Sequence, residues 1–305
     1  MLLEVLFLIA GLVLLVKASD ITINRATALS QLSGISQITI GFIFIAIVTS
    51  LPELSIGIIS SIQGEGTLSL GNLIGADIAN LALVFGIMSF IGFNMGKIYS
   101  VRLEQALILT AGIAFFIIIL GEIGLAFGVF CLLIFYLFSS SVMKEGIVTP
   151  PEKGIKTIRI IRAALMLIAS VSLVIVSAYI VTTYAIQISI SLGIAESVIG
   201  ATILAIGTTL PELSVNVTAI RKGNISLAIG DLIGSLVTNL TLILGLVAII
   251  NPLRIGFDIV FIAFFMMAIN ALFFAMARQM NFRYKQAIVL LGIYASYLIL
   301  VSMLV

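Results

Sequence analysis

Two short stretches, TSLPE at residues 49–53 and TTLPE at residues 208–212, carry the main signal of this sequence. Each places a glutamate directly after a proline, inside a run of apolar residues long enough to lie in lipid. Glu212 follows Glu53 by 159 positions. An ionisable side chain within a membrane costs about 2.5 kcal/mol or more, so its repeated use indicates a function.

The composition predicts a membrane protein. Hydrophobic residues make up 62% of the 305 residues and charged residues only 9%, whereas about a quarter of a soluble domain is charged. The chain has no histidine and one cysteine, Cys131, which excludes imidazole sites and a disulfide within the chain. The net charge of +2 says little about partners, and we expect the lipid bilayer rather than nucleic acid around this chain.

A helix that spans a bilayer needs about 20 apolar residues, and the sequence offers ten such runs. We therefore predict an all-α polytopic membrane protein with spans near residues 2–24, 36–61, 67–93, 103–119, 122–140, 160–186, 194–219, 225–249, 256–277 and 285–304. The one clearly polar connection is KEGIVTPPEKGIKTIR at 144–159. We read it as a linker between two halves of five spans each, 1–143 and 160–305.

Basic residues predict the orientation of these spans. With the N-terminus outside, 13 of the 15 lysines and arginines fall in connections on the cytoplasmic side. The opposite connections contain Glu65, Glu122, Glu196, and Arg254 with Asp258. A miscounted span would destroy this alternation, so the charges support ten spans with both termini outside.

The two halves are internal repeats. The segment at 41–86 aligns without a gap to the segment at 200–245, with about 19 of 46 positions identical. GNLIGADIAN at 71–80 thereby matches GDLIGSLVTN at 230–239. Because each half has an odd number of spans, the second enters the membrane in the opposite sense. Inverted-topology repeats are typical of transporters whose site lies near the membrane midplane, where the repeats meet.

The repeated motif is suited to binding hard cations. Pro52 has no N–H to donate and should break its helix, leaving backbone oxygens near Thr49 without partners. Thr49 and Glu53 stand four residues apart, which places them on one face of a helix. Thr208, Pro211 and Glu212 repeat the arrangement in the second half. Together these groups predict a cavity lined by oxygen atoms, the environment that calcium prefers.

Further polar residues accompany each motif. Ser50 and Thr209 sit at the breaks, and Asn80 and Asn239 follow the glycine-rich turns of the third and eighth spans. Two acids break the symmetry of the repeats. Asp77 has no polar counterpart because Leu236 stands at the equivalent position, and we expect Asp231 to cap a helix N-terminus.

The paired TSLPE and TTLPE motifs, each followed by a GN or GD segment that ends in asparagine, resemble the two alpha repeats of sodium/calcium exchangers in the calcium/cation antiporter superfamily. The resemblance covers essentially the whole chain and is most specific over 41–86 and 200–245. It implies that Glu53 and Glu212 are the main calcium ligands, joined by backbone oxygens of Thr49 and Thr208. It also implies sodium sites that include Ser50, Thr209, Asn80, Ser235 and Asn239, and first and sixth spans that slide across the rest.

Departures from the family pattern concern sodium rather than calcium. Val48 replaces a usual glycine, and Ala76 stands where a sodium-binding serine is expected. Asn239 occupies a position at which some relatives carry aspartate. Asp77 is an additional acid beside the site and our candidate ligand for a third sodium ion. These changes leave the calcium pair intact and leave the sodium stoichiometry and the coupling ion open.

The sequence therefore predicts an antiporter of the cell membrane that exchanges Na⁺ for Ca²⁺ by alternating access, not an enzyme and without a cofactor. Two ionised glutamates carry the charge that one Ca²⁺ or two Na⁺ neutralise. The first alternative is a H⁺/Ca²⁺ antiporter that uses the same glutamates. More remote alternatives are a channel and an intramembrane aspartyl protease built on Asp77 and Asp231. A pocket enclosed by the two repeats of one chain is compatible with a working monomer.

Overall fold

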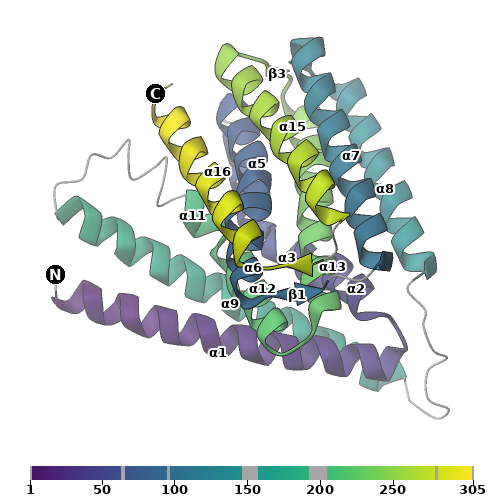
Figure 1. Cartoon of the computed structure of the whole chain (residues 1–305), viewed down its shortest axis with the longest axis vertical. Coiled ribbons are helices and arrows are strands. Elements are labelled where there is room, and N and C mark those ends of the chain that lie inside the picture. The colour runs from purple at the N-terminus through teal and green to yellow at the C-terminus, as the bar shows by residue number, and fades with distance from the viewer. Residues whose placement is uncertain are drawn as a thin grey trace.

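Helices dominate the computed structural model, which describes residues 2–62, 66–94, 97–145, 157–191, 205–278 and 281–303 (Figure 1). The N-terminal half contains α1 (Leu2–Ser33), α2 (Gln37–Ile40), η1 (Gly41–Ile45), α3 (Ala46–Thr49), α4 (Leu51–Ile62), α5 (Gly66–Ala79), η2 (Asn80–Val84), α6 (Phe85–Ile91), β1 (Phe93–Asn94), α7 (Lys97–Leu120), β2 (Glu122–Ile123) and α8 (Leu125–Glu145). The C-terminal half contains α9 (Thr157–Ser191), α11 (Ala205–Thr208), α12 (Leu210–Arg221), α13 (Ile225–Val237), η4 (Thr238–Ile243), α14 (Leu244–Ile250), β3 (Leu253–Arg254), α15 (Phe257–Ala277), β4 (Asn281–Phe282) and α16 (Tyr284–Ser302). The η segments are π-helical.

The predicted spans coincide with these helices. Within the described ranges, eight helices are long and apolar enough to cross a membrane, and a bent pair, Gln37–Thr49 with Leu51–Ile58, makes a ninth. The predicted span 194–219 is described only from residue 205, as α11 and α12. Most of the predicted linker 144–159 lies outside the described residues. The chain is an all-α polytopic membrane protein, and its orientation in the membrane stays a prediction.

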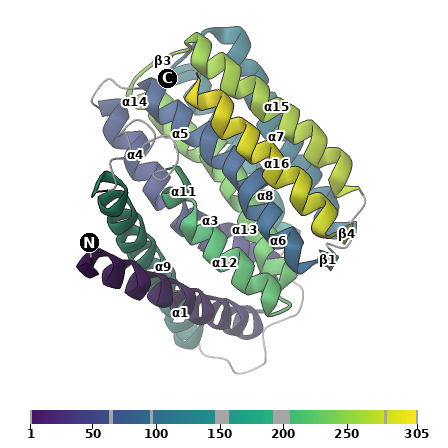
Figure 2. The same ribbon diagram turned by 60° about the vertical axis from the view of Figure 1, so that its left-hand side comes forward.

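The two longest helices form a pair of their own. α1 has 32 residues and α9 has 35, and they lie side by side across the ends of several other helices (Figures 1 and 2). A 35-residue helix is about 50 Å long, whereas the hydrocarbon core of a bilayer is about 30 Å thick. Both helices are therefore longer than a perpendicular crossing of the hydrocarbon core requires. Phe7 of α1 stacks on Tyr184 of α9 at 4.9 Å between ring centroids.

The two halves deviate from regular helix at matching places. The second span is interrupted at Ser50, and the equivalent span is interrupted at Thr209. The third and eighth spans contain the π-helical segments η2 and η4 at equivalent positions. Two short antiparallel ladders, which the sequence did not predict, join the halves: β1 pairs with β4, and β2 pairs with β3. The ladders lie at opposite ends of the bundle (Figure 2).

α13 lies at the centre of the bundle, where every residue from Leu227 to Val237 is buried. It packs against α2, η1 and α3, and glycines allow this close approach. A Cβ atom on Gly234 would lie 2.8 Å from the carbonyl oxygen of Phe42 and would collide with the Cβ of Ala46. A Cβ on Gly230 would collide with the carbonyl oxygen of Ile38. The broken second span is thus held directly against α13.

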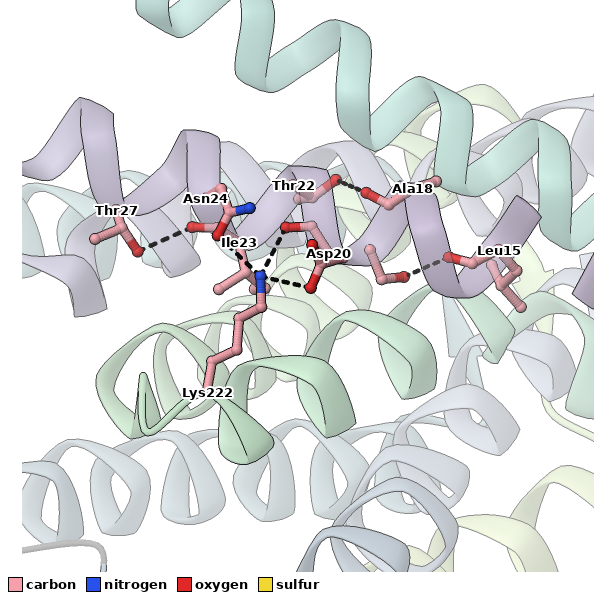
Figure 3. Close-up of polar contacts among 9 residues, drawn as sticks. Leu15, Ala18, Asp20, Thr22, Ile23, Asn24, Thr27 and Lys222 are labelled. Atoms are coloured by element: carbon pink, nitrogen blue, oxygen red, sulfur yellow. Dashed lines mark hydrogen bonds and ion pairs between the residues drawn. The ribbon is translucent and has the colours of Figure 1, made fainter. Parts of the chain in front are cut away.

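α1 is joined to the C-terminal half by polar contacts. Lys222, in the turn after α12, forms an ion pair with Asp20 at 2.6 Å and donates a hydrogen bond to Oδ1 of Asn24 at 2.8 Å (Figure 3). Farther along the same contact, the hydroxyls of Ser19 and Ser214 are 2.6 Å apart. The ion pair is partly exposed, so it adds little stability and can be broken at low cost.

We expect Gly234→Ala to destabilise the protein by about 1–3 kcal/mol, because the new methyl group meets backbone atoms that cannot yield. Thermal unfolding in detergent measures the change. The matched control is Gly112→Ala in α7, where a Cβ would meet no described atom within 4 Å. That control should be neutral or slightly stabilising, since alanine favours helix over glycine. Equal losses in both variants would contradict the close-packing role of Gly234.

Candidate functional site

The helix breaks place two glutamates at the start of new helices. α3 ends at Thr49 and α4 begins at Leu51, so Glu53 lies in the first turn of α4. Glu212 lies likewise in the first turn of α12. The N-terminus of a helix carries a partial positive charge that stabilises a carboxylate. Glu53 is 1% exposed and Glu212 is 2% exposed, so both are enclosed by protein.

Each glutamate contacts a threonine of the opposite half. The carboxyl of Glu53 interacts with the hydroxyl of Thr208, and the carboxyl of Glu212 with the hydroxyl of Thr49. The sequence predicted that Thr49 and Glu53 share one helix face. The structure interrupts the helix at Ser50 between them and bends its two segments by 43°. The two halves therefore interlock at the site, and the carboxyls of Glu53 and Glu212 lie close enough to interact electrostatically.

The third and eighth spans add amide and carboxyl groups. Asn80 begins η2 and Asn239 lies within η4, and π-helical turns are frequent at functional sites. Asn239 Nδ2 donates a hydrogen bond to Asp77 Oδ1 at 2.9 Å. Asp77 is fully buried, and its carboxyl also interacts with that of Glu53. The structure thus brings Asp77, the acid without a repeat counterpart, to the site.

Asp231 does not cap a helix. α13 begins at Ile225 with Asn224 as its N-cap residue, and Asp231 lies in the helix interior at 0% exposure. The glycine and aspartate of the GD segment suggested a helix start, but the apolar residues on both sides of them continue one helix. Asp231 accepts a hydrogen bond from Asn216 Nδ2 at 2.6 Å. Its carboxyl also interacts electrostatically with the hydroxyl of Thr49 and the carboxyl of Glu212.

Many oxygen atoms of this cluster lack a hydrogen-bond partner in the described part of the chain. Ten such atoms are buried, and they belong to side chains of the second, third, seventh and eighth spans: Ser50 Oγ, Glu53 Oε2, Asp77 Oδ2, Asn80 Oδ1, Glu212 Oε2, Asn216 Oδ1, Asp231 Oδ1, Ser235 Oγ, Thr238 Oγ1 and Asn239 Oδ1. Each unsatisfied buried polar atom costs about 1–3 kcal/mol and requires an explanation. Cations bound among these oxygens provide one.

The charge of the cluster supports the same explanation. The buried charged side chains of the described ranges are all acids: Glu53, Asp77, Glu212 and Asp231. Four buried carboxyls without a buried lysine or arginine need protons or bound cations to be neutral. Among the described residues, no three carboxyls are grouped closely enough to hold one metal ion together. Neutral oxygens must therefore complete any cation site here.

The sequence located most of this cluster. Of the ten residues predicted for the site, nine are buried and Thr208 is half-buried. Ser50 and Ser235 present unpartnered hydroxyl oxygens, whereas the hydroxyl of Thr209 donates to the carbonyl oxygen of Ile206 at 3.0 Å. Sequence analysis missed Asn216 and Thr238. Both are polar, whereas the equivalent positions of the first repeat hold Gly57 and Ala79. This difference between the repeats was the feature of the sequence that could have identified them.

Comparisons with known proteins agree with this geometry. The family described as Sodium/calcium exchanger protein matches residues 3–143 and again residues 162–303. The chain belongs to the sodium/calcium exchanger family. Sodium/calcium exchanger MaX1 of Methanosarcina acetivorans is 29% identical, with 82% of this chain and 84% of the relative covered. Inner membrane protein YrbG of Escherichia coli is 27% identical, with 83% and 81% covered.

A solved structure shares the fold. The sodium-calcium exchanger NCX_Mj, soaked with 10 mM Na⁺ and zero Ca²⁺, superimposes with a TM-score of 0.83 at 26% identity, over 96% of this chain and 97% of that chain. The ten-helix inverted repeat predicted from the sequence fits this family. A transporter family leaves no support for the aspartyl protease alternative. Asp77 and Asp231 also hydrogen-bond to different asparagines and lie beside different glutamates.

The hydrogen bond between Asn239 and Asp77 should show energetic coupling. Asn239→Leu leaves a buried carboxyl without its donor and should cost about 1–3 kcal/mol of stability. The double variant with Asp77→Leu removes both groups and should lose less than the sum of the single losses, by about 0.5–3 kcal/mol. Unfolding in detergent without added sodium or calcium measures this cycle.

A neutral pair provides the matched control for that cycle. Thr110 Oγ1 and Asn270 Oδ1 form a buried hydrogen bond at 3.3 Å in a different part of the bundle. The cycle of Thr110→Val and Asn270→Leu should give a smaller coupling, because no charge is involved. Additive losses for Asn239 and Asp77 would contradict the pairing.

Proposed function

We propose that this protein exchanges Na⁺ for Ca²⁺ across the membrane and that Glu53 and Glu212 hold the calcium ion. The main observation is the pair of buried carboxyls, one from each half, that lie in the first turns of the helices after the two breaks and interact electrostatically. Each retains an oxygen without a hydrogen-bond partner among the described residues. Calcium takes six to eight oxygen ligands, and the backbone oxygens of Thr49 and Thr208 supply neutral ones.

Charge explains why the ions exchange. Two ionised glutamates carry two negative charges, which one Ca²⁺ or two Na⁺ neutralise. Because both kinds of ion need the same carboxylates, they exclude each other. A protein with bare carboxylates would have to carry uncompensated charge through a low-dielectric region, which is costly. Reorientation is therefore favoured when the site is loaded, which couples the flux of one ion to that of the other.

We assign the remaining predicted residues to sodium. Ser50, Asn80 and Asp77 lie on the N-terminal half, and Thr209, Ser235 and Asn239 on the C-terminal half. The unpartnered oxygens of Ser50, Asn80 and Ser235 can accept a cation directly. Thr209 donates its only hydrogen to a backbone oxygen, which leaves its lone pairs available. Asp77 supplies the negative charge that a third sodium ion would need.

We propose α1 and α9 as the moving elements and 1–143 and 160–305 as the two functional repeats. The close glycine contacts hold α13 and the second span together, whereas α1 and α9 pack mainly on each other. Sliding of this pair would expose the site to one side and then to the other. One chain supplies all the proposed ligands, so a monomer suffices in the cell membrane, and no cofactor is required.

The first prediction concerns the two carboxylates. In liposomes loaded with sodium, an outward sodium gradient should drive calcium uptake by the protein. Glu53→Gln or Glu212→Gln should abolish this uptake because the calcium site loses a charge. Glu122→Gln is the matched control, since Glu122 is exposed on β2 and should leave uptake unchanged. Uptake driven by a proton gradient without sodium would identify proton coupling instead.

The second prediction concerns the movement of α1. In a Cys131→Ala background, Ser19→Cys with Ser214→Cys should form a disulfide, because the two hydroxyl oxygens lie 2.6 Å apart. The crosslink should stop sodium-driven calcium uptake while calcium binding in detergent persists, and a reducing agent should restore uptake. Each single cysteine variant serves as control. Full exchange by the crosslinked protein would exclude sliding of α1 over α12.

A further inference from the structure

A second polar pair lies beside the proposed calcium site and belongs to neither proposed ion set. Asn216 is one helical turn beyond Glu212 in α12, and Asp231 faces it from α13. Asn216 Nδ2 and Asp231 Oδ2 are 2.6 Å apart, and both side chains are 0% exposed. Both lie between Glu212 and the turn that contains Lys222, on the side of the bundle predicted to face the cytoplasm.

Each member of this pair keeps an unpartnered oxygen. Oδ1 of Asn216 and Oδ1 of Asp231 have no hydrogen-bond partner within the described ranges. The hydrogen bond between the two side chains uses the amide nitrogen and one carboxyl oxygen, so the amide oxygen and the second carboxyl oxygen stay buried without a partner. These atoms are acceptors only, so a cation can satisfy both, whereas another acceptor cannot.

The hydroxyl of Thr49 connects this pair to Glu212. This hydroxyl donates to the backbone carbonyl oxygens of Ile45 and Ala46, each at 3.2 Å, and interacts electrostatically with the carboxyls of Glu212 and Asp231. A hydroxyl has one hydrogen, which is shared here between two backbone carbonyl oxygens, so its lone pairs remain available. The oxygen of Thr49 is therefore able to accept a cation near these two carboxyls.

The inverted repeat makes this feature one-sided. The positions equivalent to Asp231 and Asn216 in the first half are Asn72 and Gly57. Asn72 carries no charge and is only half-buried, and glycine has no side-chain oxygen. The pair therefore adds a negative charge and two free oxygens on one side of the site only. Symmetric packing does not account for a pair that exists in one repeat alone.

We propose that Asp231, Asn216 and Thr49 form an additional sodium-binding position next to Glu212, on the side of the Lys222 turn. This inference rests on the proposed sodium/calcium exchange, and the position is distinct from the one assigned to Asp77. One additional carboxylate with neutral amide and hydroxyl oxygens matches a monovalent hard cation in charge and ligand type. The position gives sodium on that side a first binding place beside the calcium site.

Sodium binding to the purified protein tests this position directly. Equilibrium binding of ²²Na⁺ in detergent should show one sodium ion fewer in Asp231→Asn than in the wild type, or sodium affinity lower by at least about tenfold. Asparagine has the same shape as aspartate, so the substitution removes the charge alone. Asparagine is also the residue at the equivalent position, 72, of the first repeat. Asn216→Ser keeps a donor for Asp231 but removes the amide oxygen, and it should weaken the same binding step.

The control and the contradicting outcomes separate this inference from the proposed function. Asp258→Asn removes an exposed acid at the start of α15 and should leave sodium binding unchanged. Unaltered sodium binding in both Asp231→Asn and Asn216→Ser, with sodium-driven calcium uptake by the wild type, overturns only the additional position. An altered pH dependence of uptake with unaltered sodium binding assigns Asp231 a proton and likewise overturns it. A wild type that neither binds sodium nor exchanges it overturns both proposals.

Discussion

Burial of acids without bases is the constraint on which the rest of this structure depends. Glu53, Asp77, Glu212 and Asp231 are enclosed by protein, and no buried lysine or arginine accompanies them in the described ranges. Isolated carboxylates are too costly to keep in an apolar interior. The protein must take positive charge from outside itself. In the exchange proposed here, the ions that neutralise these carboxyls are the ions that the protein moves.

The architecture serves to bring broken helices together. Proline ends one helical segment and starts another, so that Glu53 and Glu212 sit at helix N-termini instead of helix centres. Glycines on α13 then let the broken second span approach to backbone contact. The threonine at each break reaches the glutamate of the opposite half. Neither half alone can therefore form the site, and a change in how the halves meet changes the ligands.

The two inverted repeats share their pattern of helices and breaks but differ in their buried charges. Breaks, π-helical segments and short ladders recur in both halves. Asp77 and Asp231 do not recur, since Leu236 and Asn72 occupy their equivalent positions. The two acids flank the central glutamates, Asp77 beside Glu53 and Asp231 beside Glu212. The matching helices of the two repeats support alternating access, while the unequal charges can make the two sides of the site bind sodium differently.

The sequence by itself determined the membrane class, the repeats and the residues of the central site. The membrane class follows from the composition, and the repeats and the predicted site residues follow from a motif that recurs in the second half. Neither observation depends on how the helices pack. Only the tertiary structure decided which groups meet. Local spacing paired Thr49 with Glu53 and made Asp231 a helix cap. The packed structure pairs Thr49 with Glu212 and buries Asp231 against Asn216, because contacts between helices depend on where helices break and cross, which no single helix encodes.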